Sequence, residues 1–165
     1  MASRSWLKQE ALEVIYELSD LYDLQINRIR LGAGRSATVV TASCCSKEPP
    51  NCCPKCGAVR SLRGHGRKIT IFRDVPHATG TGVGIQVDRA RFRCVNCGMT
   101  SLAPVAHMDQ KFRMTERMVE RICMEAVQRP FSAIASDYAI DEKTVRRIAK
   151  DRIPCIIGRV RPVDS

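Results

Sequence analysis

Two cysteine pairs are the residues of this chain whose spacing points most directly to chemistry. They occur as Cys53-Pro-Lys-Cys56-Gly57 and Cys94-Val-Asn-Cys97-Gly98. A two-residue spacer lets both thiolates of a pair reach one ion, and the glycine that follows permits a tight turn in which backbone N–H groups can point at sulfur. Two such pairs supply the four thiolates that zinc takes in a closed structural site. We therefore predict structural Zn²⁺ held by Cys53, Cys56, Cys94 and Cys97.

The other cysteines and the histidines fit this site less well. Cys52 competes with Cys53, and we prefer Cys53 because only it gives the two-residue spacer. The alternatives to zinc are a redox dithiol, which would need one pair only, and buried free cysteines. With four ligands in place, no open position is left for metal catalysis. Free or structural roles are expected for Cys44, Cys45, Cys123, Cys155, His65, His77 and His107, with Cys123 in a helix core.

Composition indicates the class of partner and the compartment. The 165 residues carry a net charge of +10, which favours a nucleic acid first and an acidic membrane surface second. Nine cysteines, an odd number, argue against a fully paired disulfide framework. Acidic residues interrupt the apolar pattern of residues 1–18, which excludes a signal peptide, and no apolar window reaches the ~20 residues of a membrane span. We expect a cytoplasmic protein, associated with the nucleoid if it is bacterial.

The elements before the cysteines are a helix and a hairpin. Apolar residues recur at spacings of four and three over residues 6–21, as expected for a helix with one apolar stripe. This stripe either packs on its own domain or forms the seam of a homodimer. Residues 24–31 and 36–42 are predicted to form two strands around a glycine-containing turn, and residues 43–52 a linker. The members of the stripe are Leu7, Ala11, Val14, Leu18 and Leu21.

Between the cysteine pairs, the sequence predicts a strand–loop–strand unit rich in arginine. Residues 68–72 and 85–92 are the expected strands, and Gly80, Gly82 and Gly84 form the expected connection. Alternation along a strand places Arg89, Arg91 and Arg93 on one face, opposite Ala90 and Phe92. That face is either simply solvated or a stripe that contacts phosphates. The other basic residues of the unit are Arg60, Arg63, Arg67, Lys68 and Arg73, and they are opposed only by Asp74 and Asp88.

The C-terminal part fits a helix-turn-helix. Helices are predicted over residues 115–128, 131–138 and 142–151, and prolines 154 and 162 predict an irregular end. The turn of residues 139–141 has the length that the motif allows, with Asp141 as N-cap of the last helix. Ala139 departs from the motif, because glycine would relieve this turn. The expected core residues are Ile134, Ala135, Tyr138, Ile140, Val145 and Ile148.

The last helix presents basic side chains to solvent. Its N-terminal part would enter the major groove of DNA, so Lys143, Thr144 and Arg147 are the candidates for base edges. Arg146, Lys150 and Arg152 are better placed for phosphates. The alternative is a three-helix bundle whose basic helix is only solvated.

These predictions combine into an α+β chain. It has an N-terminal helix and β-hairpin in residues 1–50, a four-cysteine zinc-ribbon-like unit in 51–104, and a three-helix helix-turn-helix in 112–153. An irregular tail is expected over 154–165.

The order of these motifs resembles the N-terminal region of transposases of the insertion-sequence L-three family. The motifs that carry the resemblance are Cys53–Cys56, His65-Gly66, Asp74-Val75-Pro76, the run 89–97 and the helix-turn-helix. The resemblance spans roughly residues 24–150. It implies that the zinc ribbon and the helix-turn-helix recognise transposon ends in double-stranded DNA. In the family, cleavage belongs to a larger C-terminal domain of RNase H-like fold.

Fourteen residues follow Asp151, so we expect no catalytic domain and no enzyme activity. The first functional hypothesis is a truncated, transposase-like protein that binds DNA sequence-specifically. The alternatives are a free-standing transcriptional regulator with the same modules and a zinc-scaffolded protein-interaction module.

Overall fold

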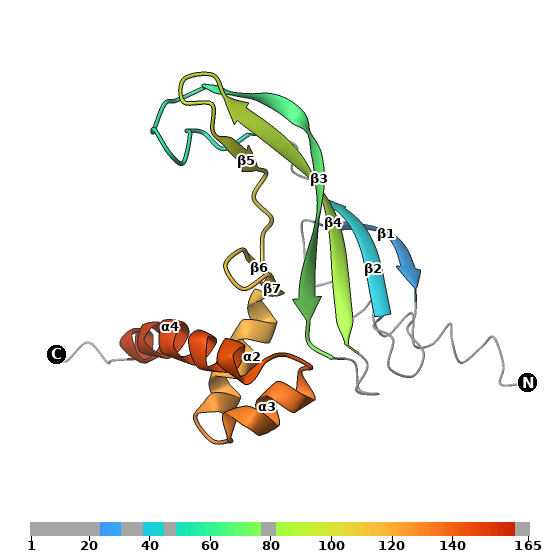
Figure 1. Ribbon diagram of the computed structural model, residues 1–165, viewed down its shortest axis with the longest axis vertical. Coiled ribbons are helices and arrows are strands. Elements are labelled where there is room, and N and C mark those ends of the chain that lie inside the picture. Colours follow the sequence, from blue (N-terminus) through green and yellow to red (C-terminus); the bar gives the residue numbers. More distant parts are fainter. Residues whose placement is uncertain (1–23, 31–37, 45–48, 77–81, 161–165) are drawn as a thin grey trace, which may run out of the picture.

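A computed structural model describes residues 24–30, 38–44, 49–76 and 82–160. These residues form one mixed sheet and three helices, so the predicted α+β class is confirmed (Figure 1). The strands are β1 (Leu24–Arg30), β2 (Thr38–Cys44), β3 (Leu62–Asp74), β4 (Val83–Cys94), β5 (Thr100–Leu102), β6 (Met108–Asp109) and β7 (Met114–Thr115). The helices are α2 (Glu116–Ala126), α3 (Phe131–Asp137) and α4 (Glu142–Val160).

The sheet joins the N-terminal hairpin to the unit between the cysteines. Its strand order is β1-β2-β4-β3-β7-β6, with β5 paired to β4. Strands β1 and β2 are antiparallel, as the predicted hairpin requires, and β2 runs parallel to β4. The hairpin therefore shares a sheet with the strands between the cysteine pairs, although their sequence patterns predicted two separate units.

Strands β3 and β4 are longer than predicted and form an antiparallel ribbon. In Figure 1 this ribbon extends from the cysteine turns at one end to the neighbourhood of the helices at the other. Gly84 was expected in the connection, but it lies within β4, paired with Val39 of β2 and Arg73 of β3. Backbone pairing on both sides holds this glycine in a strand despite its low β-propensity.

The ribbon buries opposite faces in its two halves. Val83, Ile85 and Val87 of β4 pack with Phe72 of β3 in one core. Further along β4, Phe92 packs in a second core with Leu62, Ala103, Cys53 and Cys94. Because successive side chains of a strand alternate, residues 87 and 92 point to opposite faces. The second core includes two of the cysteines, and the first includes Val40 and Ala42 of the hairpin strand β2.

The three helices form a third core. The side chains predicted to be internal, Ile134, Ala135, Tyr138, Val145 and Ile148, are buried, and Ile140 packs against them. Cys123 lies in the same core, as predicted, with 1% of its surface exposed. Thr115 caps α2 by accepting a hydrogen bond from the Met118 N–H at 3.3 Å.

Helix α4 corrects the prediction of an irregular end after residue 153. It continues through Pro154 to Val160. A proline inside a helix removes one N–H donor and clashes with the preceding turn, which bends or weakens a helix but does not have to end it. The predicted N-terminal helix, with its proposed dimer seam, lies outside the described residues. In the part of the chain that is described, no helix is long and apolar enough to cross a membrane.

Candidate metal centre and helix-turn-helix surface

The two cysteine pairs adopt the same turn. The Gly57 N–H donates to the Cys53 carbonyl at 2.9 Å, and the Gly98 N–H donates to the Cys94 carbonyl at 3.0 Å. Both glycines have positive φ angles, +70° and +71°. L-residues with a side chain rarely adopt this conformation, so the glycine after each pair is required by the turn.

The tertiary structure brings the four sulfurs of Cys53, Cys56, Cys94 and Cys97 within 4.8 Å of one another. The distance from Cys53 to Cys97 is 3.6 Å between sulfurs, and that from Cys56 to Cys94 is 3.8 Å. A tetrahedral zinc ion with Zn–S bonds of about 2.3 Å places its sulfurs about 3.8 Å apart. Two edges of the cluster therefore match a tetrahedral thiolate site, and a metal bound there would supply structural cross-linking.

Hydrogen bonds around the sulfurs prepare them as ligands. The Cys94 sulfur lies 3.3 Å from the Ser61 hydroxyl. That hydroxyl, which can turn its proton to a Cys94 thiolate, and the backbone N–H of Cys97 lower the pKa of Cys94 to about 6. Backbone N–H groups of Cys56 and Lys55 likewise lower the pKa of Cys53. A thiolate, not a thiol, is the form that binds metal.

Cys56 behaves in the opposite way when no cation is present. The Ala58 N–H favours its thiolate, but desolvation and the three neighbouring thiols outweigh it and raise its pKa to about 12. Four thiolates cannot form together without a cation, because like charges at this distance disfavour one another. The cluster is thus a donor set that a dication completes.

Cys52 stays outside this cluster. Its side chain is exposed, and its backbone bridges to Val59, whereas Cys53 is buried in the cluster. The cluster therefore contains Cys53 and not Cys52. His65 is exposed on β3. His107 Nδ1 lies 3.8 Å from Glu116 Oε2. Neither histidine belongs to the cysteine cluster. His77, Cys45 and the side chains of Cys44 and Cys155 lie outside the described part.

The predicted arginine stripe of β4 requires a correction. Arg89 is only 3% exposed. Its guanidinium donates to the Ala103 carbonyl and to Gln110 Oε1, and it stacks 5.9 Å above the Phe72 ring. The segment after β5 covers this part of the face, so Arg89 is internal. Arg91 is half-buried and Arg93 is exposed, so a contact with an outside partner is limited to the end of β4 near the cysteines.

A buried carboxylate joins the ribbon to the helices. Asp74, at the end of β3, is 2% exposed. Its Oδ1 accepts from the Thr115 hydroxyl at 2.6 Å and from Arg117 Nε at 2.9 Å, while Oδ2 pairs with the same guanidinium. Thr115 in turn caps α2. Asp74 therefore fixes the start of α2 against the sheet, which is a structural role for the Asp-x-Pro motif.

A second buried carboxylate removes Arg152 from the predicted phosphate contacts. Asp109 accepts from the backbone N–H groups of Lys111 and Phe112 at 2.8 and 2.9 Å. It also forms an ion pair with the Arg152 guanidinium, although the Asp109 side chain is only 2% exposed. A charge so deeply buried needs its partner, so Arg152 is used to hold α4 against the β6–β7 turn. A local sequence pattern does not indicate this pair, because its members are 43 positions apart in the chain.

The turn between α3 and α4 explains how alanine replaces glycine. Ala139 has a φ of +50°, a left-handed conformation that glycine adopts more easily than alanine, as expected from the departure noted in the sequence. The Ile140 N–H donates to the Ala135 carbonyl at 3.0 Å, and the Ala139 N–H donates to Ser136 at 3.2 Å. This is a Schellman arrangement, in which the residue after the cap is left-handed and the next one makes an apolar contact. Ile140 makes that contact with the helical core.

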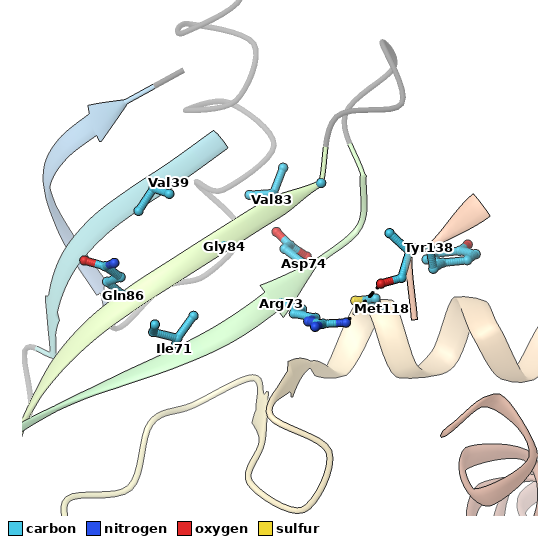
Figure 2. Close-up of a pocket in the computed structure, with 11 residues that line it drawn as sticks. Val39, Ile71, Arg73, Asp74, Val83, Gly84, Gln86, Met118 and Tyr138 are labelled. Carbon is cyan, nitrogen blue, oxygen red and sulfur yellow. Dashed lines mark hydrogen bonds between the residues drawn. The ribbon is translucent and has the colours of Figure 1, made fainter. Parts of the chain in front are cut away.

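A cleft of about 330 Å³ marks the junction of the sheet and the helix-turn-helix. Figure 2 shows Val39, Ile71 and Gln86 on its strand side and Met118 and Tyr138 on its helical side.

At this junction the Arg73 guanidinium donates to the Ala139 carbonyl at 3.1 Å, drawn as a dashed line in Figure 2. The strained turn of the motif is therefore held by a residue of β3.

Helix α4 exposes the basic residues predicted to face solvent. Lys143, Arg146, Arg147 and Lys150 are exposed and Thr144 is half-buried. With 3.6 residues per turn, the four basic positions fall within an arc of roughly 100°, opposite the buried Val145 and Ile148.

Two of these side chains have neighbours within the fold. Arg146 pairs with Glu142 at 2.7 Å. The Arg147 guanidinium lies 5.8 Å from the centre of the Phe112 ring, which restricts its direction.

In a comparison with known protein families, the family model for the helix-turn-helix domain of transposase family ISL3 matches residues 104–153 of this chain. The matched segment begins before β6 and ends within α4, so it includes both members of the Asp109–Arg152 pair. The resemblance inferred from the sequence motifs is confirmed for this segment. No curated protein and no solved structure matches the chain.

Proposed function

We propose that this protein binds double-stranded DNA sequence-specifically, with the N-terminal half of α4 in the major groove. The observation that carries the proposal is the basic arc of α4 on a segment that matches a transposase helix-turn-helix. The second helix of such a motif reads base edges through its N-terminal residues. An arc of cations on this helix is suited to both base edges and phosphates.

Arg147 is the strongest candidate for a base contact. Its stacking on Phe112 orients the guanidinium and reduces the side-chain freedom that binding would remove. Arginine can make a bidentate contact to O6 and N7 of guanine, worth about 1–3 kcal/mol of discrimination. Lys143 and Thr144 lie on the same side of the helix one turn earlier and are further candidates.

Lys150 and Arg146 are assigned to phosphates. Lys150 has no ion pair among the described residues, and it lies one turn beyond Arg146, away from the start of the helix. Arg146 forms an ion pair with Glu142, which partly neutralises its charge, so we expect it to contribute less than Lys150 to DNA affinity. Arg89 and Arg152 are not part of the proposed surface, because their guanidinium groups hold the fold together.

The test is a selection of bound DNA from a random pool at a stated salt concentration, followed by two variants. Arg147→Ala should change the preferred base at one or two positions of the site. Lys150→Ala should weaken binding to all sequences alike. Arg121→Ala, on the exposed side of α2, is the control and should change neither. Equal, uniform losses in the two α4 variants would contradict the placement of this helix in the groove.

We further propose that the natural targets are transposon ends, and that this module recognises DNA without cutting it. In the described ranges, the four cysteines are the one cluster of three or more potential metal ligands. Asp74 and Asp109 are both bound to arginine. Terminal inverted repeats should be bound in preference to shuffled repeats, and supercoiled plasmid with Mg²⁺ should not be nicked. A preference for an adjacent promoter would favour the regulator instead.

A protein-interaction module is the second candidate, because β3 exposes two large apolar side chains. Ile69 is 62% exposed, and Ile71, which lines the junction cleft, is 55% exposed. Wild-type protein that selects no sequence from the random pool would favour this candidate.

A further inference from the structure

A basic cavity lies beside the cysteine site and is lined by residues of β3, of β4 and of the turn that follows β4. Figure 1 shows that this end of the ribbon is opposite the end that meets the helices. It measures about 360 Å³, and the side chains of Arg63, His65 and Arg93 line it together with the turn of the second cysteine pair. The Arg93 guanidinium reaches that turn, because a Cβ on Gly98 would lie 4.0 Å from its Nη2. Three basic groups therefore surround one hollow.

A β-bulge brings His65 to this cavity. The register of β3 against β4 shifts between Gly64 and Arg67, so β3 carries one extra residue there. Gly66 has a φ of +87°, which a residue with a side chain rarely adopts. Bulges redirect side chains and are common near binding sites. The His65-Gly66 motif thus has a structural consequence, the placement of a histidine beside the two arginines.

The two arginines face each other without compensation from a carboxylate. Arg63 and Arg93 are direct partners across the antiparallel pair. Like charges in this position destabilise a sheet. Neither makes an ion pair within the described part of the chain, whereas Arg67, nearby on β3, pairs with Asp88 at 2.7 Å. An anion between the guanidinium groups would turn the repulsion into two charge-assisted contacts.

We propose that Arg63, His65 and Arg93 form a pocket for a phosphate of the DNA backbone. The pocket gives the protein a second point of contact, separate from α4, and it replaces the longer arginine stripe that the burial of Arg89 excludes. Arginine and histidine donors match phosphate oxygens and carry no information on base sequence. This inference rests on the proposed function, since it assigns the phosphate to the duplex that α4 reads.

The test compares two double variants of the full chain, each with two charges removed. Arg63→Gln/Arg93→Gln changes the pocket, and Lys68→Gln/Arg121→Gln changes exposed positions away from it. Affinity for the selected duplex is measured between 50 and 300 mM salt. Losing one phosphate contact should flatten the slope of log affinity against log salt by ~0.9. The pocket variant should show this change with unaltered base preference and metal content, and the control should keep the wild-type slope.

A titration with inorganic phosphate tests whether the pocket binds a phosphate of the DNA backbone or free phosphate from solution. The Nε–H NMR signals of Arg63 and Arg93 should shift with phosphate in the free protein and should stop responding once the duplex is bound. Continued response in the complex would mean that the pocket takes free phosphate, and the proposal would be wrong. Equal slopes in the two double variants would also overturn it.

The failure of the pocket can be told apart from the failure of the proposed function. Lys143→Gln/Lys150→Gln should remove most of the affinity if α4 reads the duplex. If this variant binds normally, the placement of α4 is wrong. If it loses binding while the pocket variant keeps both slope and affinity, only the phosphate pocket is wrong.

Discussion

Replacing Asp74 by asparagine tests how the ribbon and the helices are held together. The substitution keeps the shape of the side chain and one carbonyl oxygen. That oxygen can still accept from the Thr115 hydroxyl and the Val75 N–H. The second oxygen becomes an NH₂ group that faces the Arg117 guanidinium, a donor placed against donors. The buried ion pair is lost with almost no change in volume.

The size of the effect follows from burial. The Asp74 side chain is 1% exposed and that of Arg117 is 32% exposed. Removing one partner of a fully buried pair costs about 3–5 kcal/mol, because the other charge is left uncompensated. Arg117 can recover part of its hydration, so the expected loss lies lower, at about 2–3 kcal/mol. In urea this should lower the unfolding midpoint by roughly 1 M.

Asp88→Asn is the matched control on the same ribbon. Asp88 pairs with Arg67 at 2.7 Å, but the two side chains are 37% and 45% exposed. Exposed pairs contribute about 0–1 kcal/mol, so this variant should unfold close to the wild type. Both proteins are compared by urea denaturation with metal buffered at one concentration. The Met118 N–H donates a hydrogen bond to the Thr115 side chain that caps α2. Its hydrogen-exchange rate therefore reports the stability of the start of α2 separately from global unfolding.

Equal midpoints for the two variants would refute the reasoning, since they would mean that burial of the Asp74 pair adds nothing. Unchanged exchange at Met118 in Asp74→Asn would show that the cap of α2 does not depend on this carboxylate. A midpoint shift confined to Asp74→Asn, with faster exchange at Met118, is the expected result.

Three further predictions concern the metal, the turn and a buried tyrosine. Purified protein should contain one tightly bound zinc per chain, and Cys97→Ser should lose it while Cys52→Ser keeps it, as measured by metal analysis; zinc-free wild-type protein would contradict the site. Ala139→Gly should stabilise the protein by about 0.5–1 kcal/mol, because glycine adopts a left-handed φ without the clash of a Cβ; a lower thermal midpoint would contradict the assigned turn. Burial and a hydrogen bond to Glu125 raise the pKa of Tyr138, so the stability that its neutral form contributes below pH ~10 is lost above it. Tyr138→Phe should be less stable than wild type at pH 8, and the gap should narrow at pH 10.5 in denaturation curves.

The sequence alone was enough for features whose causes lie within a few residues. The cysteine pairs with their glycines specify two turns, because the spacer and the positive φ are local requirements. The helix-turn-helix was predicted from the 3.6-residue period of its apolar side chains and the length of its turn. The strain at Ala139 could also be predicted, since a left-handed residue is needed there whatever surrounds it.

The partners of the arginines were decided only by the tertiary structure. Alternation correctly placed Arg89 and Arg93 on one face of a strand. It did not show that the segment from Ala103 to Gln110 would cover Arg89 and leave Arg93 exposed. Arg152 looked like a phosphate ligand on a basic helix until the fold brought Asp109 to it. Whether a charged side chain pairs within the fold or stays free to bind an outside partner depends on segments far away in the chain. A local sequence pattern does not show which of these segments will pack against it.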